Sequence, residues 1–91
     1  MKISVHLEFQ KSNGGIVHLL LDGKKAGMLG SGFTQVLETT EGEHTLIIKA
    51  GFRKSTLHFT STADVMVTAR FGAFFGGVDA ECQGEDLKLL P

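Results

Sequence analysis

Strict alternation of apolar and polar residues near the start of the chain limits the possible folds more than any other feature. The apolar positions of this segment are Ile3, Val5, Leu7 and Phe9. A two-residue period is that of a strand with one face in a core and the other in solvent, whereas an amphipathic helix has a period of about 3.6 residues. We therefore predict a β-strand over residues 2–9 whose apolar face lies in the core.

Segments of the same kind recur along the chain about every 8 to 12 residues, separated by turn residues. Further predicted strands cover residues 16–21, 25–29, 33–39, 45–49, 56–60 and 65–71. No stretch has the helical period, so helix should be almost absent. The pattern predicts an all-β fold, and we favour a small antiparallel β-sandwich of about seven strands over a small barrel.

Turn residues indicate how these strands connect. Asp22-Gly23 predicts a two-residue hairpin because both residue types tolerate a positive φ. Ser, Asn and paired Gly in residues 10–15 predict a turn that pairs the first strand with the second. Imperfect alternation in residues 33–39 indicates an edge strand. The acidic tail, residues 80–91, either adds an edge strand or frays.

The predicted core consists of the apolar residues that are in phase within the better-defined strands. They are Ile3, Val5, Leu7, Leu19, Leu21, Leu46, Ile48, Leu57, Phe59, Val65 and Val67.

Length and charge restrict the chain further. Its 91 residues suit one domain, and a net charge of −1 makes nucleic acid an unsuitable partner. The basic pairs Lys24-Lys25 and Arg53-Lys54 are interpreted as solvated turn residues. No continuous apolar run suits a signal peptide or a membrane-spanning helix, so we predict a cytoplasmic location and no membrane span.

The order of turns from residue 16 to residue 71 resembles that of a known family. Asp22-Gly23-Lys24 follows a short apolar strand, and Glu41-Gly42-Glu43-His44 leads into a strand that ends in Ala50-Gly51-Phe52. This layout resembles PEGA-type domains and related immunoglobulin-like β-sandwich modules. The chain lacks the family's proline before the Gly-Glu-His turn and has an additional N-terminal strand. The resemblance implies a noncatalytic module of a larger surface or envelope protein.

The residues offer no enzymatic constellation, so we predict neither catalysis nor a cofactor. Cys82 is the only cysteine, which excludes an intramolecular disulfide and a zinc site with two sulfur ligands. Ser31 lies between glycines but lacks the G-x-S-x-G order of a nucleophile elbow. The absence of Trp and Tyr also argues against carbohydrate binding.

The four histidines have no close spacing typical of metal ligands, so we assign no metal site. If the first two strands form a hairpin, His6 lies opposite His18, and a shift by one pair places Glu8 opposite His18 instead. Either arrangement could bind a divalent ion. We expect His44 to hydrogen-bond the backbone of its own turn and His58 to be a solvated outer-face residue.

Three phenylalanines among glycines, Phe71, Phe74 and Phe75, form a possible interaction surface, or they plug the open end of the core. Phe74 and Phe75 should face opposite ways if the segment is extended. We therefore predict a noncatalytic binding or structural module, acting through a protein partner or self-association. The alternative is a small ligand- or metal-binding protein that uses a histidine-bearing sheet face.

Overall fold

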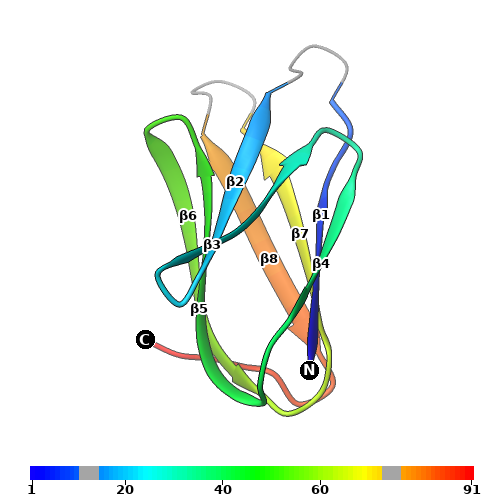
Figure 1. Ribbon diagram of the computed structural model, residues 1–91, viewed down its shortest axis with the longest axis vertical. Helices are drawn as coiled ribbons and strands as arrows, with labels where there is room; N and C mark the ends of the chain where they lie inside the picture. Colours follow the sequence, from blue (N-terminus) through cyan, green and yellow to red (C-terminus); the bar gives the residue numbers. More distant parts are fainter. Residues whose placement is uncertain (11–14, 73–76) are drawn as a thin grey trace.

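The computed structural model (Figure 1) describes residues 1–10, 15–72 and 77–91. These residues form nine strands and no helix. The strands are β1 (Lys2–Leu7), β2 (Ile16–Leu21), β3 (Lys24–Gly30), β4 (Thr34–Glu38), β5 (Gly42–Ala50), β6 (Arg53–Ser61), β7 (Val65–Phe71), β8 (Val78–Gly84) and β9 (Lys88–Leu89). The all-β prediction is confirmed. The strands outnumber those predicted because the end of the chain supplies β8 and β9.

These strands form two sheets that enclose one apolar core, an arrangement compatible with the predicted sandwich. The first sheet has four strands in the order β4-β1-β7-β8, and the second has five in the order β3-β2-β5-β6-β9. Core residues come from the inner faces of both sheets. The remaining side chains of each sheet therefore point outward and form two opposite outer faces.

The predicted pairing of the first two strands is wrong. β1 lies between β4, which is antiparallel to it, and β7, which is parallel to it. β2 belongs to the other sheet, between β3 and β5. Two consecutive strands point their apolar faces toward the same core whether they form a hairpin in one sheet or belong to different sheets. The alternation of apolar and polar residues therefore does not distinguish these two connections. The parallel pair also means that the fold is not purely antiparallel.

Two local predictions about connections are confirmed. Asp22 and Gly23 have φ values of 52° and 84°, and they join β2 to β3 as a two-residue hairpin turn. β4, predicted as an edge strand, pairs only with β1 and lies at the edge of its sheet.

The core agrees closely with the predicted set. Every predicted core residue is buried except Leu21, which is half-buried. Among the described residues, five further apolar side chains are buried: Val17, Leu29, Leu37, Ala69 and Val78.

Phe9 departs from its predicted place, because its side chain is 74% exposed. β1 ends at Leu7, two residues earlier than predicted. Beyond that point Phe9 lies against Gly32, where an added Cβ would be 3.5 Å from its ring. The alternation in the sequence thus continues past the end of the strand that it identifies.

A carboxylate clasp ties the end of the chain to the turn between β6 and β7. Asp86 accepts hydrogen bonds from the Ser61 and Thr62 hydroxyls and from the backbone N–H groups of Thr62 and Ala63. These bonds, above all the one from the Thr62 hydroxyl, lower the pKa of Asp86 to about 2. The clasp positions β9 beside β6, where the Leu90 N–H donates to the His58 carbonyl.

We expect Asp86→Ala to release β9 from β6, because it removes every acceptor of the clasp. Hydrogen exchange of the Leu90 amide should accelerate to the rate of an open chain end, while amides in β5 keep their protection. Glu85→Ala is the matched control and should leave exchange unchanged. Unaltered Leu90 protection in the Asp86 variant would contradict the role of the clasp.

Candidate functional site

Only Phe71 of the predicted phenylalanine surface lies among the described residues, so the surface stays a prediction. Phe71 ends β7, pairs with Val78 of β8, and is half-buried with its side chain packed against the core. Phe74 and Phe75 lie outside the described residues, and so does the prediction that they face opposite ways.

The predicted meeting of His6 with His18 is wrong, because the two side chains lie on outer faces of different sheets. His6 pairs with Thr34, and the two side chains are hydrogen-bonded at 2.9 Å. His18 lies between Met28 and Lys49. In the part of the chain that is described, no three His, Cys, Asp or Glu side chains are grouped to hold a metal ion.

The alternative pairing of Glu8 with His18 is also wrong. Glu8 follows β1 in the four-stranded sheet, and its carboxylate forms an ion pair with Arg70 at 3.2 Å. The cross-strand ion site that either register would have created does not exist in this fold.

His44 bonds its own turn as predicted and also has a partner that the sequence did not indicate. Its Nε2 is 2.7 Å from the Thr40 carbonyl oxygen, and its Nδ1 is 2.6 Å from a carboxylate oxygen of Asp22. Burial lowers the pKa of His44, but the bonds to Asp22 and Thr40 outweigh it and leave that pKa raised. His44 thus joins the β2–β3 turn to β5 and serves the fold.

His58, predicted to be solvated, has a side chain that is 35% exposed and an Nε2 atom 3.2 Å from Glu43 on the neighbouring strand. Cys82 is half-buried beside the core, and burial raises the pKa of its thiol, which disfavours the reactive thiolate. Ser31 accepts a hydrogen bond from the Gln10 N–H at 2.7 Å and so fastens a loop.

One outer sheet face holds an arrangement of positive charges that does not stabilise the fold. On the outer side of the five-stranded sheet, Lys49 of β5 lies directly opposite Lys54 of β6. Like charges in such a cross-strand position repel each other. Neither lysine belongs to any ion pair found among residues 1–10, 15–72 and 77–91. A third cation, Lys25 of β3, lies on the same side.

Apolar side chains accompany these lysines. Leu20 of β2 lies between Lys25 and Ile47, and Met28 of β3 lies beside His18. Met28 is 58% exposed and Ile16, at the start of β2, is 53% exposed. We call this surface the basic face, and it comprises Ile16, His18, Leu20, Lys25, Met28, Ile47, Lys49 and Lys54.

A hollow of about 370 Å³ lies in the basic face. Ile16, Leu20 and His18 line it together with Lys25, Lys49 and Gly51. Gly51 has a φ of 64°, which favours glycine, and the space beside it is open. The hollow is thus lined by apolar side chains and by two lysines, Lys25 and Lys49.

The sequence did not reveal this face because Lys25 is far along the chain from Lys49 and Lys54. Lys25, Lys49 and Lys54 resemble solvated turn and strand-end residues when they are considered one at a time. Only the β3-β2-β5-β6 pairing gathers them. The available signal was Leu20 and Ile47, which are apolar at positions that the alternation assigns to the outer side.

Comparison of the chain with known protein families, curated proteins and solved structures finds no match. Across the described residues, no helix has the length and apolar character needed to cross a membrane.

Proposed function

We propose that the chain is a noncatalytic binding module that docks an acidic protein surface on its basic face. The observation that carries this proposal is the uncompensated Lys49–Lys54 pair beside exposed apolar side chains. Carboxylates of a partner would relieve the repulsion between the two ammonium groups. Ile16 and Met28 would lose solvent contact in the same event, which adds apolar stabilisation to the electrostatic attraction.

A protein partner suits this face better than nucleic acid does. The chain has no Trp or Tyr for stacking on bases, and its net charge is −1. An extended acidic segment suits an outer sheet face on which charged and apolar side chains lie on neighbouring strands. The resemblance to PEGA-type sandwich modules, which implies a noncatalytic role in a larger protein, agrees with this proposal.

The proposal predicts binding of an extended peptide of alternating Glu and Leu, measured by fluorescence anisotropy of the labelled peptide. Lys49→Glu should weaken binding about tenfold, since it replaces an attraction by a repulsion, and added salt should weaken the wild-type complex. Lys2→Glu, a matched reversal in the other sheet, should have little effect. Equal binding of a Lys/Leu peptide, or equal binding by the Lys49 variant, would refute the proposal.

A further inference from the structure

The outer side of the four-stranded sheet carries the opposite charge to the basic face. We call it the acidic face, and its charged side chains are Glu8, Glu38, Asp79 and Glu81 against Lys2 and Arg70. Lys2 lies opposite Glu38 in the β1–β4 register. Carboxylates therefore outnumber cations on this side of the domain.

Arg70 compensates only part of that negative charge. Its guanidinium is 3.2 Å from Glu8 and 3.1 Å from Glu81, and it lies opposite Asp79 in the β7–β8 register. The charge of Glu8 and then the hydrogen bond to Glu81 raise the pKa of Arg70. One cation thus pairs with two carboxylates and lies opposite a third, which leaves negative charge available to a partner.

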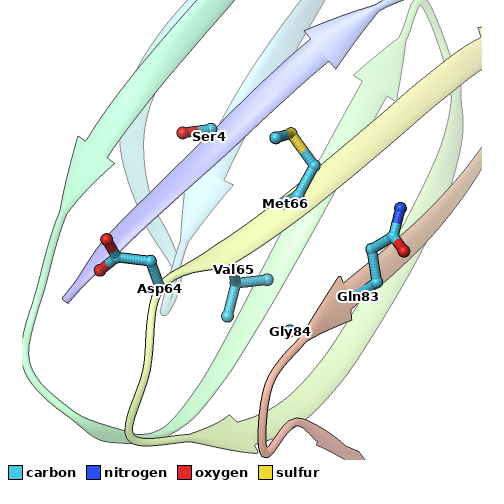
Figure 2. A pocket seen from close by; sticks show the side chains of 6 residues that line it. All are labelled: Ser4, Asp64, Val65, Met66, Gln83 and Gly84. Atoms are coloured by element: carbon cyan, nitrogen blue, oxygen red, sulfur yellow. The ribbon is translucent and has the colours of Figure 1, made fainter.

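The acidic face also has an apolar centre beside a hollow. Val36 and Met66, each 49% exposed, lie on either side of Ser4 in the registers of β4, β1 and β7. Figure 2 shows the hollow next to Met66, with Asp64 at one side and Gln83 at the other. Its volume is about 500 Å³, and it is lined by Ser4, Asp64, Val65, Met66, Gln83 and Gly84.

We propose that the acidic partner of the basic face is a second copy of this chain, which presents its acidic face. This inference rests on the proposed function and names the partner of the same site. The two faces are complementary. Each has exposed apolar side chains among charged ones, and the net charges of the two faces have opposite signs. Met28 and Ile16 of one copy project toward the surface that holds Val36, Met66 and the hollow of the next.

The geometry of the domain sets the form of such an assembly. The basic and acidic faces lie on opposite sides of one domain, so a contact between them is head-to-tail and leaves one face of each type free. Contacts of this kind extend into rows of copies unless the rotation between neighbours closes a ring. Because the attraction is between exposed charges, the association should be weak and should decline with added salt.

Sedimentation of two variants and their mixture tests this inference. Lys25→Glu with Lys49→Glu makes both faces acidic, and Glu38→Lys with Asp79→Lys makes both faces basic. We expect wild-type mass to rise with concentration at low salt and each variant to associate at least about tenfold more weakly, since like-charged faces meet. An equimolar mixture of the two variants should recover association.

A chain that carries all four substitutions provides the control for damage to the fold, because its faces are exchanged and complementary again. It should associate as the wild type does. A wild-type monomer at every concentration, or association that neither pair of reversals changes, would overturn the inference. If that monomer still binds the Glu/Leu peptide through Lys49, the inference fails while the proposed function stands.

Discussion

Replacing Phe59 with alanine is expected to lower the free energy of unfolding by about 3 to 5 kcal/mol. Phe59 is fully buried, and its ring lies 6.4 Å from the ring of His44, centroid to centroid. Truncation would leave a cavity between the two sheets that neighbouring strands cannot close. A domain of this size has a total stability of roughly 5 to 10 kcal/mol, so the loss is a large share of it. Urea unfolding followed by circular dichroism measures the change.

Phe52→Ala is the matched control, because that ring is 93% exposed and its loss should change stability by no more than about 0.5 kcal/mol. Should Phe59→Ala fail to fold, Phe59→Leu retains most of the volume and should cost about 1 to 2 kcal/mol. Equal unfolding midpoints for the Phe59 and Phe52 variants would contradict the packing described for the core.

The positions of Phe59 and of most core residues could be predicted because the strand period assigns each side chain to a face. Ile3, Val5 and Leu7 occupy every second position, and all three are buried as predicted. The Asp22-Gly23 turn was predictable for a similar local reason, since few residue types tolerate its dihedral angles. Both inferences depend only on neighbours in the sequence.

Strand order depends on contacts between distant segments, and the alternation carries no information about it. Apolar and polar residues alternate in β1 and β7 in the same way whether these strands pair with each other or with another strand. The β5–β6 hairpin alone places Lys49 opposite Lys54. Lys25 lies on the same face as this pair only because β2 lies between β3 and β5. The candidate site therefore became visible only with the sheet order.

The partner of His44 was unpredictable for the same reason. The sequence indicated that His44 would bond its own turn, and its Nε2 does reach the Thr40 carbonyl. Asp22 lies 22 residues away along the chain and meets His44 only because β2 pairs with β5. The raised pKa of His44 is thus a consequence of sheet order.

Asp22→Asn is expected to destabilise the fold by about 1 to 2 kcal/mol in mildly acidic solution, because it removes a charged hydrogen-bond acceptor that is itself half-exposed. Burial raises the pKa of Asp22, but bonds from the Thr45 N–H and His44 outweigh it and leave that pKa lowered. Asparagine is chosen because it tolerates the positive φ of this turn.

The pH dependence of that loss follows from the two pKa shifts. The raised pKa of His44 adds stability below the ordinary value of 6.5, and this stability disappears as the pH rises through the folded-state pKa. The lowered pKa of Asp22 adds stability above 3.8, which disappears as the pH falls through its folded-state pKa.

Both contributions coexist between these values, so the Asp22→Asn loss should be largest near pH 5.5 and smaller near pH 9. Urea unfolding at both pH values measures the difference, and an equal loss at the two would show that the ion pair with His44 does not stabilise the fold.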